Sequence, residues 1–296
     1  MLSYMGLNAN YLLILAIDLV IGAALLVAMR FMMGAVARVN PSEELAQRDN
    51  PAFGIVLAGG VFAMGILLTG VLAGDAAASP ANEAVLVLAY GVAGLAMVFA
   101  AHAVFDKVSM SSFAVRDELR AGNIAVAMTD AGNAIATALI VRAVLDWVQD
   151  GGLVTALVGL GSFLVSQALL SLVSFYRIKL HSRTGQAPLM ETIRGGNTAL
   201  ALRFSGYRIA AAFAISSALN LAPFDPSAVI WVFGSWILVA VVSLMVLAIL
   251  SMIAERILLW GIDLQDEVDR QGNVAIGAVQ AAVYTALGLA MLAVNS

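Results

Sequence analysis

The chain has 296 residues, of which 62% are hydrophobic and only 11% are charged, whereas soluble domains are about 25% charged. This composition excludes an ordinary soluble globular protein and predicts an all-α protein that crosses the lipid bilayer several times. The chain contains no cysteine and only two histidines, His102 and His181. Disulfides and thiolate chemistry are therefore excluded, and we expect no metal site, no cofactor and no nucleic-acid partner.

Eight apolar runs approach or exceed the roughly 20 residues that a helix needs to cross a bilayer. The first run, at about 11–33, follows a segment without a basic stretch or a cleavage site, so we expect no removable signal peptide. The other runs lie at about 51–73, 83–105, 123–147, 152–176, 198–220, 227–254 and 274–294. The sequence thus predicts eight transmembrane helices.

The basic residues indicate the orientation, because all those outside the spans fall in the connections after the first, third, fifth and seventh spans. The opposite loops carry only acidic residues. Positive charge stays on the cytoplasmic side, so we expect four cytoplasmic linkers and both termini outside. The basic residues of the linkers are Arg30, Arg38, Arg48, Lys107, Arg116, Arg120, Arg177, Lys179, Arg183, Arg194, Arg256 and Arg270.

A short charged segment recurs before every second span, as in "DELRAGNIAVAMTD" at 117–130 and "DEVDRQGNVAIGAV" at 266–279. Its asparagines are spaced by 73, 74 and 76 residues, which indicates internal repeats. We predict four parallel two-helix repeats, paired into four-span units at 1–148 and 149–296. The repeated residues are the asparagines Asn50, Asn123, Asn197 and Asn273, the acids Glu44, Asp117, Glu191 and Glu267, and the arginines Arg48, Arg120, Arg194 and Arg270.

Each repeated asparagine stands where the next helix begins. Asparagine is a favoured N-cap because its side-chain oxygen accepts from the free amides of the first turn. Four such helix starts beside four arginines could instead bind an anion such as a phosphate head group. The amides are already satisfied by the caps and acids lie nearby, so capping is the preferred interpretation.

Beyond each asparagine the repeats share small residues at positions +2, +9 and +13, counted from that asparagine. These positions fall within about 40° of one another on a helix, and small faces let transmembrane helices approach closely. We therefore expect the second helix of each repeat to be a tightly packed inner helix. The small residues are Ala52, Gly59 and Ala63, then Ala125, Gly132 and Ala136, then Ala199, Gly206 and Ala210, and finally Ala275, Ala282 and Ala286.

The motif of an acid, an arginine, Gly-Asn-x-Ala and a small-residue helix resembles that of the YjfL-like bacterial inner-membrane proteins, domain of unknown function 350. The resemblance covers nearly the whole chain as two tandem domains. It implies a bacterial plasma-membrane protein without a settled activity, in a family sometimes encoded near membrane-remodelling proteins. The first repeat departs from the motif, because "RDNP" at 48–51 replaces Gly-Asn and adds a proline.

Ionisable residues inside membrane spans are costly and often functional. Positions +7 and +11 share one helix face, and there we expect a buried polar cluster with an ion pair between Asp130 and Arg208. Gln280 and Tyr284 would support it, and Asp18 is a competing partner for Arg208. The same cluster could be structural, holding helix register without binding a solute.

Two other polar residues near the linkers have simpler interpretations. Arg203 lies about 9 Å of helix from the inner end, so its side chain could reach the cytoplasmic head groups. His102, near the end of the third span, more often caps or packs than relays protons.

Two functions fit these patterns. The first is permeation or transport of an ion or small polar solute through the buried cluster. The second is a membrane scaffold or envelope-stress partner, whose cytoplasmic linkers recruit a peripheral protein or acidic lipid. The sequence leaves a homo-oligomer open, and it shows no catalytic constellation, so we do not expect an enzyme.

Overall fold

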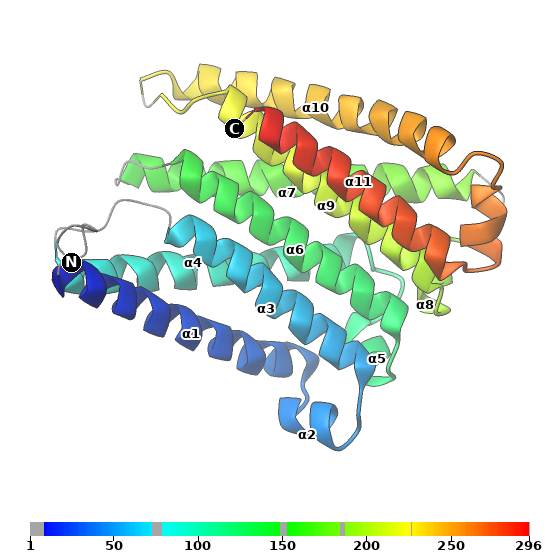
Figure 1. Ribbon diagram of the computed structural model, residues 1–296, viewed down its shortest axis with the longest axis horizontal. Helices are drawn as coiled ribbons and strands as arrows, with labels where there is room; N and C mark the ends of the chain where they lie inside the picture. Colours follow the sequence, from blue (N-terminus) through cyan, green and yellow to red (C-terminus); the bar gives the residue numbers. More distant parts are fainter. Residues whose placement is uncertain (1–8, 73–78, 149–152, 184–186, 226, 296) are drawn as a thin grey trace, which may run out of the picture.

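A computed structural model describes residues 9–72, 79–148, 153–183, 187–225 and 227–295, and these residues are helical with short connections (Figure 1). The long helices come in pairs, and a short linker segment of six residues separates the two helices of each pair. The long helices are α1 (Ala9–Ala37), α3 (Pro51–Val71), α4 (Pro80–Val108), α6 (Ile124–Trp147), α7 (Leu153–Ser182), α9 (Thr198–Leu221), α10 (Val229–Leu258) and α11 (Val274–Val294). The linker segments are α2 (Pro41–Ala46), α5 (Val115–Arg120), α8 (Leu189–Arg194) and the π-helical turn η2 (Gln265–Arg270).

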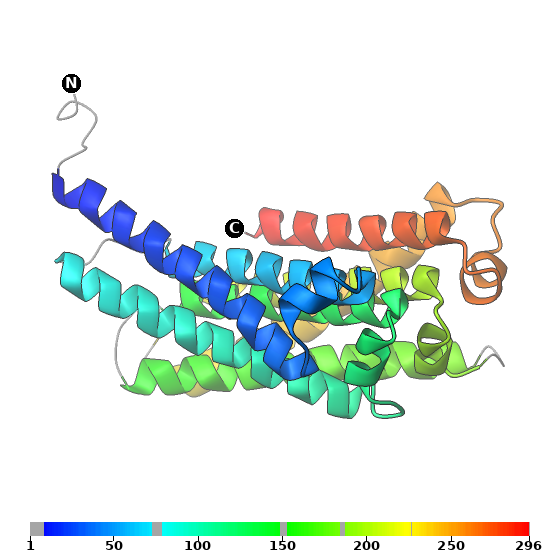
Figure 2. The same cartoon turned by 90° about the horizontal axis from the view of Figure 1, so that it is seen from below.

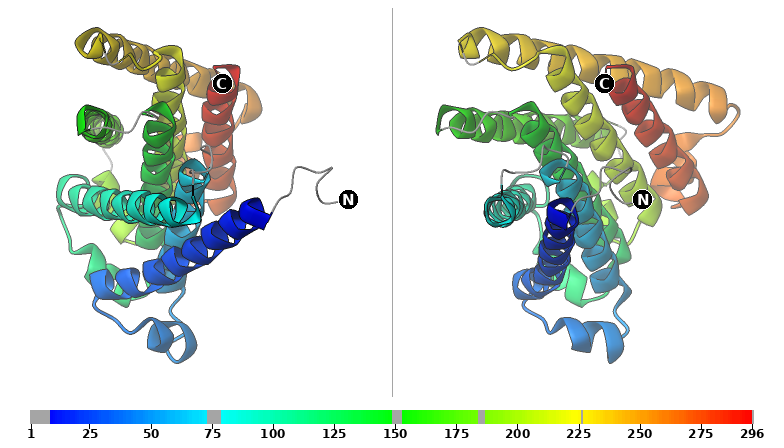
Figure 3. Two further views of the ribbon diagram at one scale, coloured as in Figure 1. Left: turned by 90° about the vertical axis from the view of Figure 1, so that its left-hand side faces the viewer. Right: turned by 60° about the vertical axis from the view of Figure 1, so that its left-hand side comes forward.

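The second helices of the four repeats lie side by side in a row, with α3 packed on α6, α6 on α9 and α9 on α11 (Figure 1). We call them the inner helices. These four inner helices begin at the end of the molecule where the linker segments gather (Figure 2). The first helix of each repeat lies beside this row, in the order α1, α4, α7 and α10 (Figure 3). The fold is therefore two crossed layers of helices, with the linkers at one end.

The helices differ widely in how much of their surface is buried. In α6, 83% of the most apolar window is buried, against 17% in α1 and 22% in α10 and α11. The exposed residues of α1 and α10 are large and apolar, as for Leu19 and Leu238, which suits contact with lipid chains. The core thus lies along α6 and α9.

Seven of the long helices among the described residues have the length and composition to cross a membrane, so the chain is a multi-pass membrane protein. The eighth long helix, α9, is not among these seven. It has 24 residues and carries Arg203 and Arg208, which lower its hydropathy. α9 packs on α6 on one side and α11 on the other, so its polar groups face protein.

The small residues at position +9 are where neighbouring inner helices approach most closely. A Cβ built on Gly59 would lie 2.4 Å from Cβ of Ala131 on the next helix, and one on Gly132 would lie 2.5 Å from Cβ of Ser205. A Cβ on Gly206 would lie 2.4 Å from Cα of Ala281. The prediction of tightly packed inner helices holds for α3, α6 and α9. It is wrong for one face of α11, where Ala275, Ala282 and Ala286 are exposed, because no further inner helix among the described residues packs against that face.

Each repeated asparagine is the N-cap of its inner helix. The side-chain oxygen accepts from backbone N–H groups two or three residues on, at distances of 2.9–3.4 Å. The residue before each asparagine has a positive φ, which Gly122, Gly196 and Gly272 adopt without strain. In the first repeat this residue is Asp49, with φ of 48°. Aspartate is one of the few other residues that tolerates this conformation, which explains the departure of the first repeat from Gly-Asn.

Candidate functional site

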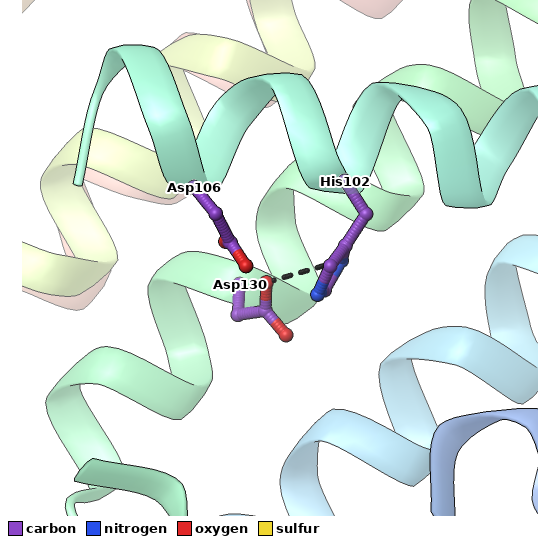
Figure 4. Close-up of side chains that lie close together, drawn as sticks. All are labelled: His102, Asp106 and Asp130. Atoms are coloured by element: carbon purple, nitrogen blue, oxygen red, sulfur yellow. Dashed lines mark ion pairs between the residues drawn. The ribbon is translucent and has the colours of Figure 1, made fainter. Parts of the chain in front are cut away.

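A cluster of three ionisable side chains lies between α4 and α6, near the linker end (Figure 4). Nδ1 of His102 lies 3.2 Å from a carboxylate oxygen of Asp130, and Asp106 projects from the next turn of α4 toward the same point. One donor atom from each of the three residues lies within 4.8 Å of the others. We name His102, Asp106 and Asp130 the acidic cluster.

Two side chains of the acidic cluster are shielded from solvent: Asp130 is 1% exposed and His102 is 4% exposed. Apart from the approach of His102 Nδ1 at 3.2 Å, no described residue donates a hydrogen bond to the carboxylate of Asp130. One oxygen of the half-buried Asp106 is likewise buried without a donor. Buried carboxylates without donors are unfavourable unless a proton or a cation neutralises them, so this arrangement can hold either.

Arg208 lies one turn further along the same interface. One of its guanidinium nitrogens donates to the side-chain oxygen of Asn133 at 2.6 Å. The other donates to the hydroxyl of Ser174 and, at 3.4 Å, to the carbonyl of Leu170. The guanidinium carbon lies 4.4 Å from the ring centroid of Phe105, which stands between the two acidic-cluster residues of α4. Arg208 is thus held by neutral groups, in cation–π contact with the helix that carries His102 and Asp106.

The predicted ion pair between Asp130 and Arg208 is wrong. Asp130 pairs with His102 of α4, and Arg208 contacts α6 and α7. The prediction assumed that positions +7 and +11 of the repeats converge on one axis. Because the inner helices form a row, this face of each helix turns instead toward the first helix of its own repeat.

Gln280 and Tyr284 illustrate the same rule at the other end of the row. Both donate to one carboxylate oxygen of Glu255 on α10, the first helix of their own repeat. Arg177 donates to the hydroxyl of Tyr284 at 3.2 Å and stacks on the ring of Tyr207, 4.1 Å from its centroid. These residues therefore form a second polar group, distinct from the acidic cluster.

Asp18 does not reach either polar group. It lies half-buried on α1, in the electrostatic range of Glu83. Glu83 belongs to the first turn of α4, whereas His102 and Asp106 belong to its last two turns. Asp18 therefore lies near the opposite end of the membrane-crossing region, and the expectation that it competes for Arg208 is wrong.

Arg203 reaches the linker end, as expected from its position, but its partner is protein. It donates to Asp269 of η2 at 3.1 Å, and His181 of α7 lies 3.6 Å from the other oxygen of that carboxylate. The three side chains line a small cavity of about 60 Å³ with Arg177. This group ties η2 to α7 and α9, so the predicted contact with head groups is not required.

The linker charges contact the cap asparagines, residues of their own linker and residues of the neighbouring linker. Glu44 and Glu267 each accept from the amide of the asparagine six residues on, at 2.8 and 2.7 Å. In the second repeat this acceptor is Glu118, while the expected Asp117 is exposed. The pKa of Arg194 is raised above its usual value by its hydrogen bond to Glu118, 2.9 Å away. The other linker contacts are Arg48 with Glu43 and Glu44, Arg120 with the carbonyl of Arg38, Arg194 with Glu191, and Arg270 with Asp266.

Sequence reasoning missed Asp106 and Glu255, the two acids that face position +7 of the next inner helix. One signal was available: Asp106 precedes Asn123 by 17 residues and Glu255 precedes Asn273 by 18. Both acids therefore occupy matching places at the end of the first helix of a repeat. Their partners, Asp130 and Gln280, also match.

An open cleft of about 400 Å³ lies at the linker end and has Asp106 of the acidic cluster in its wall. The wall also includes Lys107 at the end of α4 and Arg116 at the start of α5. Solvent ions can therefore approach the half-buried Asp106 from this end, and Asp130 lies directly behind it (Figure 4). The lining residues are Asp106, Lys107, Ser111, Phe113, Ala114, Val115 and Arg116.

The comparisons with known proteins place the chain in a family without assigning an activity. No curated protein and no solved structure matches the chain. The family model described as Domain of Unknown Function (DUF350) matches twice, at residues 6–145 and 151–294. The two matches together cover almost the entire chain, so this multi-pass membrane protein belongs to the DUF350 family and carries two tandem copies of its domain.

Proposed function

We propose that this protein takes up a small cation, with the proton as the first candidate, at the acidic cluster and passes it across the membrane. In this proposal α9 is the eighth span, the four two-helix repeats are parallel, and the linkers face the cytoplasm of a bacterium. The carrying observation is the burial of Asp130, whose carboxylate lies 3.2 Å from His102 and accepts no other hydrogen bond from the described residues.

A charge count supports cation uptake. Asp106 and Asp130 bring two carboxylates close to each other and to His102. The ion-pair partner of Asp130 among the described residues is His102, so with a neutral His102 the buried carboxylate of Asp130 carries an unpaired charge in a region of low dielectric. An unpaired buried charge is strongly unfavourable, so the group is balanced when it holds one more proton or one monovalent cation.

The surroundings of the acidic cluster favour uptake from the linker end. The cleft reaches Asp106 from that end. Further along α6 the helix is closely packed, with apolar side chains such as Ala134, Ala138 and Val141 beside the buried polar Asn133 and Thr137. Transfer across the membrane therefore requires a rearrangement that opens this closely packed half, as in alternating access.

A scaffold is the second candidate, because several linker charges remain exposed. The side chains of Arg48 and Arg270 are 57% and 67% exposed, which leaves them able to contact acidic lipid or a peripheral protein. Several of the linker charges are already paired, within their own linker or with the neighbouring one. We therefore favour ion uptake.

The test is flux in sealed liposomes that contain the purified protein, followed with a pH-sensitive dye and, for Na⁺ and K⁺, with ion-selective dyes. We expect wild-type flux to be lost in Asp130→Asn. The matched control is Asp117→Asn, which makes the same chemical change at a side chain that is 64% exposed; it should keep wild-type flux.

Equal flux in Asp130→Asn and wild type would refute the site. Absence of wild-type flux for protons, Na⁺ and K⁺ would refute conduction and favour the scaffold. Each variant is first shown to keep the wild-type melting temperature in detergent to within a few degrees, so that a loss of flux is not a loss of fold.

A further inference from the structure

The small face of the fourth inner helix has no neighbour among the described residues. Positions +2, +9 and +13 are buried in α3, α6 and α9, because each of these helices packs that face on the next inner helix. In α11 the same positions are exposed. These three residues, which we name the donor face, are Ala275, Ala282 and Ala286.

The first inner helix, α3, has a complementary exposed face on the side that is turned away from α6. Each of the helices α6, α9 and α11 receives the preceding helix on small residues at positions +4, +8 and +15, such as Gly277, Ala281 and Gly288 of α11. In α3 these positions are exposed or half-exposed, and a Cβ built on Gly65 would meet no atom within 4 Å. We name these residues of α3, which are Gly54, Ala58 and Gly65, the acceptor face.

A chain of hydrogen bonds at the linker end is interrupted at the same place. The amide nitrogens of Asn50, Asn123 and Asn197 donate to backbone carbonyls of the following linker, those of Leu119, Arg194 and Val268, at 2.7–3.0 Å. The amide of Asn273 donates to Glu267 of its own linker, and no other linker segment of the described residues lies beside it. This polar observation is independent of the small-residue pattern and marks the same open end.

We propose that the donor face of one copy packs on the acceptor face of a second copy, so that the row of inner helices continues from chain to chain. The partner is a second copy because the interface repeats one that the chain already makes three times, between α3 and α6, α6 and α9, and α9 and α11. The contact is head-to-tail, so it generates a closed ring or an open chain. It does not depend on the proposed ion uptake.

The fit between the two faces follows that between α9 and α11. There, Ala199 lies against Gly277 and Ala210 against Gly288, so closely that a Cβ on either glycine would come within 2.4–2.7 Å of a backbone oxygen. Between copies the same pairs are Ala275 with Gly54 and Ala286 with Gly65.

The third pair differs by one methyl group. Ala282 would lie against Ala58, where the internal interface has Gly206 against Ala281. The two helices therefore sit slightly further apart at this level than α9 and α11 do. A wider contact suits an interface between copies that forms after each chain has folded.

Cysteine crosslinking tests the proposal, because the chain has no cysteine of its own. Two differently tagged chains, one with Ala58→Cys and one with Ala282→Cys, are co-expressed and oxidised in native membranes. We expect a covalent heterodimer that carries both tags, and no covalent dimer from either variant alone. A chain that carries both substitutions should give a ladder or a closed ring of linked copies.

The control replaces Ala282→Cys by Leu238→Cys, which places the thiol on the lipid-exposed side of α10; it should not crosslink to Ala58→Cys. A covalent dimer of Ala282→Cys with itself would show a two-fold contact and overturn the head-to-tail arrangement. Absence of the mixed crosslink, together with a monomer mass by native mass spectrometry from lipid nanodiscs, would also overturn the proposal.

Discussion

Gly206 is the residue on which the packing of the inner row depends most directly. A Cβ at this position would lie 2.4 Å from Cα, 2.6 Å from Cβ and 2.8 Å from the carbonyl oxygen of Ala281. Two of these atoms belong to backbone, so no side-chain rotation relieves the overlap. Gly206→Ala must therefore move α9 and α11 apart.

The size of the effect follows from these distances. Carbon atoms in contact are separated by about 3.5–4.0 Å, so the two helices must move apart locally by roughly 1 Å. Overpacking of this kind costs about 1–3 kcal/mol, while replacing a helical glycine by alanine recovers up to about 1 kcal/mol of helix propensity. A control with the same propensity gain isolates the packing cost.

The control is Gly234→Ala on α10, where a Cβ would meet no atom within 4 Å. Thermal unfolding in detergent is followed by circular dichroism. The free energy of unfolding of Gly206→Ala should be lower than that of Gly234→Ala by about 1–3 kcal/mol. If Gly206→Ala is as stable as Gly234→Ala, then α9 and α11 are not in the close contact described, and the row of inner helices is incorrect.

Three further predictions concern the linkers and the polar groups. Asn123→Ala should destabilise the fold by about 1–2 kcal/mol, because the side chain caps α6 and also donates to the carbonyl of Arg194. The control Asn82→Ala, at an exposed position of α4, should change the melting temperature little. Equal losses of stability in the two variants would refute the capping role. Arg203→Gln and Asp269→Asn should be non-additive in a double-mutant cycle of unfolding free energies, since the two side chains bond directly; additive losses would refute the pairing. The pKa of Asp225 lies below its usual range because the hydroxyl and backbone N–H of Ser227 donate to it, so its contribution to stability is present above its ordinary pKa and disappears as the pH falls through the lowered value. Ser227→Ala should raise that pKa in a carbon-13 carboxyl titration of the protein in micelles, and an unchanged value would contradict this cause.

The helix starts could be read from the sequence because they depend on local contacts. Asn50, Asn123, Asn197 and Asn273 accept from amides only two or three residues away, and the chain pattern is sufficient to indicate such caps. The small residues at position +9 were also identified correctly as contact points. Both features follow from residues on one helix, without knowledge of its neighbours.

The partners of the buried charges could not be read in this way. The sequence grouped Asp130 and Arg208 correctly on the +7/+11 face, but which element lies opposite that face depends on how the helices are arranged. A ring would bring the four faces together, whereas the observed row turns each toward the first helix of its own repeat. His102 and Asp106 were overlooked as partners because the end of α4 resembles an ordinary interfacial segment.

The exposed face of α11 was missed for a related reason. Its small residues match those of the other inner helices, so the repeat pattern predicts that they are buried. A pattern repeated four times gives only three contacts when the helices form an open row. The unmatched faces at the two ends are a property of the arrangement and are invisible in any single repeat.

The central claim is that the acidic cluster holds one exchangeable proton or cation, and infrared difference spectroscopy tests it most directly. Spectra of the reconstituted protein are recorded at acidic and alkaline pH, with and without Na⁺ or K⁺. We predict a carboxyl or imidazole band that changes with pH or with the added ion and is absent in Asp130→Asn but present in Asp117→Asn. A difference spectrum that is the same for wild type and Asp130→Asn would show that the cluster exchanges nothing, and would contradict the claim.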